Sequence, residues 1–100
     1  MGLIEKYKEQ IQRLCKNHKV KSLYSFGSVN THHFSKESDV DLMVDFETND
    51  PFEYSDSYFD LKFELEKIFR RSIDLLENKA IKNPFLRENI DKSKVLIYGQ

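Results

Sequence analysis

Hydrophobic and polar residues alternate along this chain with two different periods, one typical of helices and one typical of strands. Apolar side chains recur at helical spacing over residues 3–18, with Lys, Glu and Gln between them, which predicts an amphipathic helix. Residues 20–26 are rich in Val, Leu, Tyr and Phe, which suits a strand that Gly27 and Ser28 bring to an end. Residues 29–38 are polar and predict a loop or a short helix.

The rest of the chain continues with strands and helices in turn. Residues 40–46 place apolar side chains at every second position, which is the period of a β-strand. Asn49, Asp50 and Pro51 form a predicted turn, and Pro51 suits the first position of a helix. The further predicted elements are a helix over 52–69, a strand over 73–76, a short helix over 83–90 and an edge strand over 95–98.

This order of elements predicts the fold class. Strands separated by helices favour a mixed β-sheet flanked by helices, which is an α/β (α+β) architecture. One hundred residues are enough for one modest hydrophobic core but not for a second lobe, so we expect a single domain over residues 1–100. The composition is 39% hydrophobic and 33% charged, which indicates a folded protein rather than a disordered one.

Charge and cysteine content narrow the setting in which the protein works. The net charge of −1 gives no general attraction to nucleic acid, so direct nucleic-acid binding is not expected. Cys15 is the single cysteine, and its place on the apolar face of the first helix favours a buried side chain over a reactive one. Because the chain shows neither a signal peptide nor an apolar run long enough to span a bilayer, we expect a cytoplasmic protein without a membrane partner.

The residues with the clearest chemical meaning lie between the first two predicted strands. Gly27 lacks a side chain where a backbone amide must approach a phosphate, and Ser28 offers a hydroxyl to a phosphate oxygen. After ten intervening residues come Asp39 and Asp41, whose carboxylates project from the same face because they are two apart on a strand. Two such carboxylates repel each other unless a cation lies between them, and Mg²⁺ is the natural cation beside substrate phosphates.

Each of these residues has a simpler interpretation when it is taken alone. Gly27 and Ser28 are common in ordinary turns. Taken alone, Asp39 and Asp41 favour the solvated face of a half-buried strand over a metal site. The spacing and the strand context together favour the metal site over both alternatives.

The joint pattern resembles the signature of the DNA polymerase β-like nucleotidyltransferase superfamily. In that family a Gly-Ser pair is followed, after ten residues, by Asp-x-Asp, as Gly27-Ser28 is followed here by Asp39-Val40-Asp41. The short length resembles the minimal nucleotidyltransferases (MNT) of this superfamily, many of which are antitoxins paired with HEPN-domain toxins. Residues 72–76 resemble the later strand that brings a third carboxylate, and residues 82–98 resemble the ending of these antitoxins.

This resemblance implies a role for each residue of the motif. Asp39 and Asp41 would hold two Mg²⁺ ions, and Asp74 would bind the catalytic ion and help to deprotonate the attacking hydroxyl. Gly27 and Ser28 would bind the phosphates of ATP or another NTP. The acceptor that the family suggests is a tyrosine of a cognate HEPN ribonuclease toxin, which would receive AMP. A structural role is the alternative for Asp74, because apolar residues flank it on its strand.

One segment departs from the family's pattern. Members commonly continue the Gly-Ser pair with Ala-Arg-Gly, whereas this chain has Asn30, Thr31 and His32. The missing arginine removes a positive charge near the triphosphate, which leaves a second function open: an antitoxin that neutralises its toxin by binding alone. His32 and His33 lack a Cys or His cluster at zinc spacing, which favours a solvated loop over a metal site.

The predicted helix over residues 52–69 is rich in aromatic side chains. We expect this series to belong mainly to the core. A domain of this size does not comfortably bury all thirteen aromatic residues, so part of the series is expected to form a partner surface. The series comprises Phe52, Tyr58, Phe59, Phe63 and Phe69.

Overall fold

The protein was analysed as a computed structural model that describes residues 2–27 and 39–99. Its elements follow the predicted order, and their ends lie within a few residues of the predicted ends. The short 3₁₀ helix η2 is an addition that the sequence pattern did not predict. The elements are α1 (Leu3–Asn17), β1 (Val20–Phe26), β2 (Val40–Phe46), α2 (Pro51–Phe69), β3 (Ile73–Glu77), η2 (Asn78–Ala80), α3 (Pro84–Ser93) and β4 (Val95–Gly99).

The strands form one mixed sheet in the order β3-β2-β1-β4. β1 is antiparallel to both of its neighbours, β2 and β4, whereas β2 and β3 are parallel. A parallel pair needs a crossover connection, and α2 supplies it between β2 and β3. The predicted mixed sheet flanked by helices is therefore confirmed, as is the edge position of β4.

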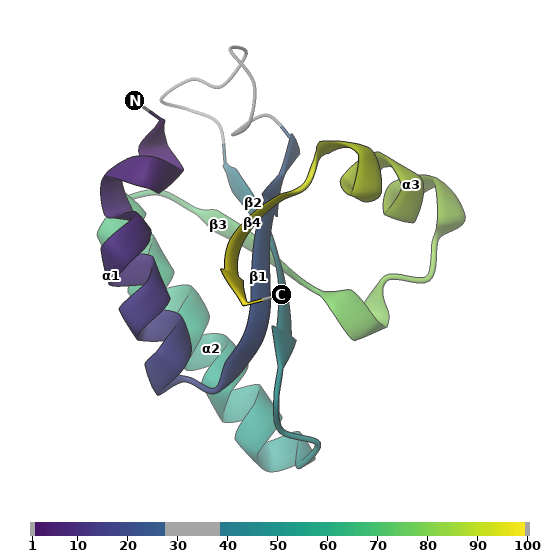
Figure 1. Cartoon of the computed structure of the whole chain (residues 1–100). Coiled ribbons are helices and arrows are strands. Elements are labelled where there is room, and N and C mark those ends of the chain that lie inside the picture. The colour runs from purple at the N-terminus through teal and green to yellow at the C-terminus, as the bar shows by residue number, and fades with distance from the viewer. Residues whose placement is uncertain (1, 28–38, 100) are drawn as a thin grey trace.

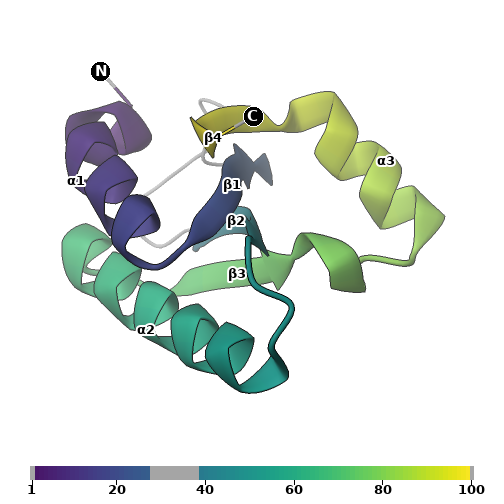
Figure 2. The same ribbon diagram turned by 60° about the horizontal axis from the view of Figure 1, so that its bottom comes forward.

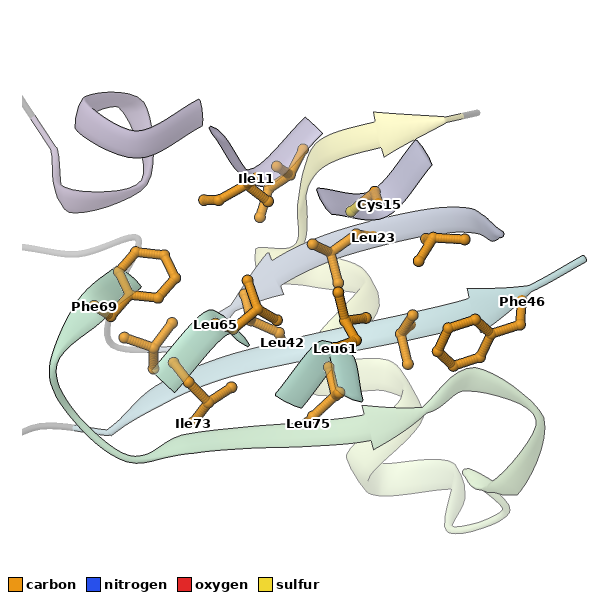
Figure 3. Close-up of a cluster of buried hydrophobic side chains, with 14 residues drawn as sticks. Ile11, Cys15, Leu23, Leu42, Phe46, Leu61, Leu65, Phe69, Ile73 and Leu75 are labelled. Carbon is orange, nitrogen blue, oxygen red and sulfur yellow. The ribbon is translucent and has the colours of Figure 1, made fainter. Parts of the chain in front are cut away.

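Helices cover both faces of this sheet. α1 and α2 lie side by side on one face, and α3 lies on the other (Figures 1 and 2). The larger core cluster fills the space between the sheet and the α1/α2 layer (Figure 3). Its fully buried members come from both helices and from the sheet, including Ile11, Cys15, Leu23, Leu42, Leu61 and Leu65. The prediction that Cys15 is buried is confirmed.

A smaller cluster lies on the α3 face of the sheet. There Ile90 of α3 is buried with Phe26 of β1 and Met43 of β2. Because this second cluster covers its other face, β2 is buried on both sides over most of its length, and even Asp45 is only 8% exposed. β2 is therefore not the half-buried strand of an open sheet, which was the simpler interpretation of its alternating pattern.

A polar N-cap residue fixes the start of both α2 and α3, and a proline occupies the first position of each helix. At the start of α2, the Asp50 side chain accepts a hydrogen bond from the amide of Phe52 at 3.0 Å. At the start of α3, the Asn83 side chain accepts one from the amide of Phe85 at 2.9 Å. Each cap is followed directly by a proline, which needs no amide partner in the first helical turn. The predictions that Pro51 occupies the first position of a helix and that a helix begins at residues 83–84 are confirmed.

The aromatic series of α2 divides between the core and the surface. Phe69 is buried and Tyr58 is half-buried, but Phe52, Phe59 and Phe63 are 84%, 56% and 65% exposed. The expectation that the series belongs mainly to the core was wrong for these three residues. Their helical positions place them opposite the buried Leu61 and Leu65, on the outward side of α2.

Over residues 2–27 and 39–99, every helix is too short or too polar to cross a bilayer.

Candidate active site

The parallel pairing of β2 and β3 brings two of the predicted site residues together. In the register of this pair, Asp41 lies opposite Asp74. Asp39 directly precedes β2, and its carboxylate lies close enough to that of Asp41 to act on it electrostatically. The three carboxylates that were predicted from separate parts of the sequence are therefore neighbours at one end of the sheet.

These carboxylates lie on the face of the sheet that carries α3. Ile73 and Leu75 point into the larger core on the α1/α2 face, so Asp74 between them faces the opposite way. Asp39 and Asp74 are exposed, and Asp41 is half-buried. An exposed Asp74 contributes nothing to the core, so a core-packing role for this residue is excluded.

Gly27 forms a tight turn directly beside the Asp41 side chain. Its φ is +73°, a conformation that favours glycine over all other residues. A Cβ atom at this position would lie 2.8 Å from Oδ2 of Asp41, closer than non-bonded atoms normally approach. The absent side chain therefore leaves space for the carboxylate, a role that the sequence pattern alone did not reveal.

The electrostatics of the cluster centre on Asp41. Partial burial raises the pKa of the Asp41 carboxyl above its usual value, and the nearby carboxylates of Asp74 and Asp39 raise it further. Each of these causes penalises the ionised form of Asp41. A cation bound at the cluster would offset all three, because it neutralises the repulsion and replaces the lost hydration.

The three carboxylates are oxygen donors of the kind that a hard divalent cation binds. In the part of the chain that the structure describes, no group of three or more His, Cys, Asp or Glu side chains already converges on a common point. Three carboxylates without a cation repel one another, so an open arrangement is what electrostatics dictates. Mg²⁺ typically takes one or two carboxylates and completes its shell with water and substrate phosphates, so these residues fit Mg²⁺.

Part of the predicted site lies outside the described residues. Ser28, the departing segment Asn30–His32, and His33 fall between residues 27 and 39, where the structure describes nothing. Their predicted roles therefore stay predictions. The described half of the site consists of Gly27, the three carboxylates and the end of α3, which reaches Gly27 through Ser93.

Comparison with known proteins decides the family. Over residues 9–100 the chain matches the family model described as Polymerase beta, Nucleotidyltransferase. The chain belongs to this nucleotidyltransferase family. The resemblance based on Gly27, Asp39 and Asp41 is thus confirmed at the level of the family.

Individual relatives agree with this assignment. A candidate protein adenylyltransferase of Methanocaldococcus jannaschii is 36% identical over 80 residues, which cover 80% of this chain and 79% of the relative. The structure of a candidate minimal nucleotidyltransferase has a TM-score of 0.76 at 27% identity and covers 95% of both chains.

A more distant likeness shows the fold alone. It is to a chain of the complex between the tri-AMPylated HEPN toxin of Shewanella oneidensis and its MNT antitoxin. The TM-score is 0.67 at 18% identity, and the match covers 98% of this chain and 74% of that chain. The fold is therefore that of the minimal nucleotidyltransferases, and the family activity is nucleotidyl transfer.

Proposed function

We propose that this protein is an antitoxin that transfers AMP from ATP to a tyrosine of a cognate HEPN-domain toxin. The M. jannaschii relative, named as a candidate protein adenylyltransferase, supports adenylyl transfer to a protein. The Shewanella oneidensis complex, in which the HEPN toxin carries AMP groups, supports a toxin as the acceptor. The single structural observation that carries the proposal is the pairing of Asp41 with Asp74 beside the Gly27 turn.

The proposed reaction assigns one task to each described side chain. Asp39 and Asp41 would hold Mg²⁺, which supplies charge neutralisation for the triphosphate and the leaving pyrophosphate. The exposed Asp74 carboxylate accepts the proton of the attacking tyrosine hydroxyl. A bond forms between that oxygen and the α-phosphorus, the bond from the α-phosphorus to the pyrophosphate oxygen breaks, and pyrophosphate leaves.

A second function is supported by different observations. The exposed Phe52, Phe59 and Phe63 form an apolar stripe along the outward side of α2, which suits a binding surface. The segment Asn30–His32 lacks the arginine that the family usually places near the triphosphate. Both features agree with an antitoxin that neutralises its toxin by binding alone.

Persistence of inhibition distinguishes the two functions. The toxin is incubated with this protein, Mg²⁺ and ATP, and the protein is then removed by an affinity tag before ribonuclease activity is measured. Adenylyl transfer predicts that the toxin stays inactive after removal, because a covalent bond outlasts a complex. Recovery of full toxin activity after removal, at the rate at which the complex dissociates, would favour the binding function.

Two Asp→Asn variants, one in the proposed site and one outside it, supply the control for this experiment. Asp41→Asn removes a proposed metal ligand, whereas Asp60→Asn removes an exposed carboxylate of α2 on the other side of the sheet. Adenylyl transfer predicts that toxin treated with Asp41→Asn recovers after removal and that toxin treated with Asp60→Asn does not. Equal behaviour of the two variants would contradict the assignment of Asp41.

A further inference from the structure

The end of α3 contacts the active site through one side chain. The amide of Gly27 donates a hydrogen bond to Oγ of Ser93 at 3.3 Å. The same Oγ donates to the carbonyl oxygen of Asn89, one turn earlier in α3, at 3.1 Å. Ser93 therefore links the backbone of α3 to the turn that follows β1, although the two residues are far apart in the sequence.

The Gly27 turn is held from two sides. Ser93 accepts a hydrogen bond from its amide. On the other side, the Asp41 carboxylate lies next to its α-carbon, so that a Cβ atom on Gly27 would be only 2.8 Å from Oδ2 of Asp41. A shift of this turn in one direction would press on the carboxylate, and a shift in the other would remove the packing that keeps the carboxylate in place. The position of Gly27 is thus coupled directly to that of Asp41.

The helix that carries Ser93 is itself firmly attached to the sheet. Both terminal nitrogens of Arg87 donate to Asn78 of η2, Nη1 to the side-chain oxygen at 2.9 Å and Nη2 to the carbonyl oxygen at 2.8 Å. One turn further along, Ile90 is buried in the smaller core cluster with Phe26 and Met43. Ser93 therefore reaches Gly27 from an anchored helix rather than from a freely moving segment.

We propose that Ser93 is a positioning residue of the active site, which acts through Gly27 on Asp41. This inference rests on the proposed function, in which Asp41 holds the metal and Gly27 belongs to the nucleotide-binding pair. The hydrogen bonds described above join Ser93 to Gly27 and Asn89 rather than to a catalytic carboxylate. The Ser93 hydroxyl holds Gly27, on whose position the space for the Asp41 carboxylate depends.

The test uses three substitutions of serine. Ser93→Ala removes the hydroxyl and is well tolerated by a helix, Ser93→Thr retains a hydroxyl, and Ser55→Ala is a matched change at an exposed position of α2. Hydrogen exchange of the Gly27 amide, followed by NMR, reports on the bond itself without any need for activity. Steady-state adenylyl transfer reports kcat and the KM for ATP.

The positioning role predicts a specific pattern across these measurements. In Ser93→Ala the Gly27 amide exchanges about tenfold faster, because a hydrogen bond that closes the turn is lost. The KM for ATP rises by about three- to tenfold, with a smaller fall in kcat. Ser93→Thr returns both quantities toward the wild-type values, and Ser55→Ala leaves both unchanged.

Several outcomes would overturn the proposal. Unchanged exchange of the Gly27 amide in Ser93→Ala would show that the bond does not hold the turn. Faster exchange with an unchanged KM would show that the bond serves stability alone, and a lower KM would show that the hydroxyl competes with the nucleotide for the amide. If Asp41→Asn turns over ATP like the wild type, the proposed function fails instead, and the exchange result still decides whether Ser93 holds Gly27.

Discussion

Asp41 of β2 lies opposite Asp74 of β3 in a parallel register, so two carboxylates lie side by side on one face of the sheet. Partial burial of Asp41 adds to their mutual repulsion, and both raise the pKa of its carboxyl. Selection for stability alone would not favour two carboxylates at these neighbouring positions. Under the proposed function, a cation bound at this pair would offset both effects.

The first prediction concerns stability in the absence of metal. Folding raises the pKa of the Asp41 carboxyl above its ordinary value of 3.8. The protonated carboxyl therefore contributes fully to stability below pH 3.8, and this contribution is lost as the pH rises through the pKa of the folded state. Asp41→Asn removes this loss, so it should raise Tm relative to wild type at pH 7 in a chelating buffer.

Thermal unfolding of the two proteins between pH 3 and 7 checks this prediction. The difference in Tm should grow with rising pH above about 4, where a free carboxyl of ordinary pKa ionises. Asp60→Asn, at an exposed position of α2, serves as the control and should show no such trend. A Tm difference for Asp41→Asn that does not depend on pH would refute the electrostatic account.

The second prediction concerns nucleotide binding. Calorimetric titration with Mg²⁺-ATP should show that Asp41→Asn binds more weakly by about 1–3 kcal/mol, the usual cost of losing a charge-assisted contact. In EDTA the wild type should lose at least as much affinity, because the metal contacts of both Asp39 and Asp41 are then absent. Equal affinities of the two proteins in Mg²⁺ would argue against a metal site at Asp41.

The third prediction assigns Asp74 to turnover rather than to the fold. Its carboxylate is exposed, and the strand positions on either side of it supply the core contacts. Asp74→Asn should therefore keep the Tm and the nucleotide affinity within a small margin while kcat falls by about 10²-fold or more, as expected for loss of a general base. A variant that melts much earlier but labels its acceptor normally would show a structural role.

The fourth prediction concerns the contact between Gly27 and Asp41. Gly27→Ala should destabilise the protein by about 1–2 kcal/mol, because alanine is strained at positive φ and its Cβ displaces the carboxylate. In an Asp41→Ala background the cost of displacing the carboxylate disappears, whereas the backbone strain of alanine at positive φ remains. Chemical unfolding of the four proteins of this double-mutant cycle measures the coupling, and strict additivity would contradict the contact.

The elements that sequence predicted well are those whose signals are local. The period of two over residues 40–46 predicted a strand, and the structure has β2 over these same residues, with Asp39 directly before it. Asp50 and Asn83, each followed by proline, marked the starts of α2 and α3. In both cases the residues that form the signal are neighbours in the chain, so no long-range contact is needed to interpret them.

The features that sequence missed all depend on contacts between distant residues. The Ser93–Gly27 hydrogen bond joins residues 66 positions apart, and no spacing rule connects a helix end to a turn at that distance. The exposure of Phe59 and Phe63 was missed because hydrophobicity alone does not say which side of a helix meets the sheet. Burial of Asp45 follows only once η2 is known to lie against β2, where Nζ of Lys79 comes within 3.9 Å of the Asp45 carboxylate.

The intact mass of the toxin tests the central claim most directly. The cognate toxin is incubated with Mg²⁺-ATP and either wild-type protein or the Asp39→Asn/Asp41→Asn variant, and the mass of the toxin is measured, followed by peptide mapping. Neither residue belongs to the core, so the variant should fold. We expect the wild type to add the mass of one or more AMP groups, located on tyrosine, and the variant to add none. A toxin of unchanged mass that both proteins nevertheless silence would contradict the account.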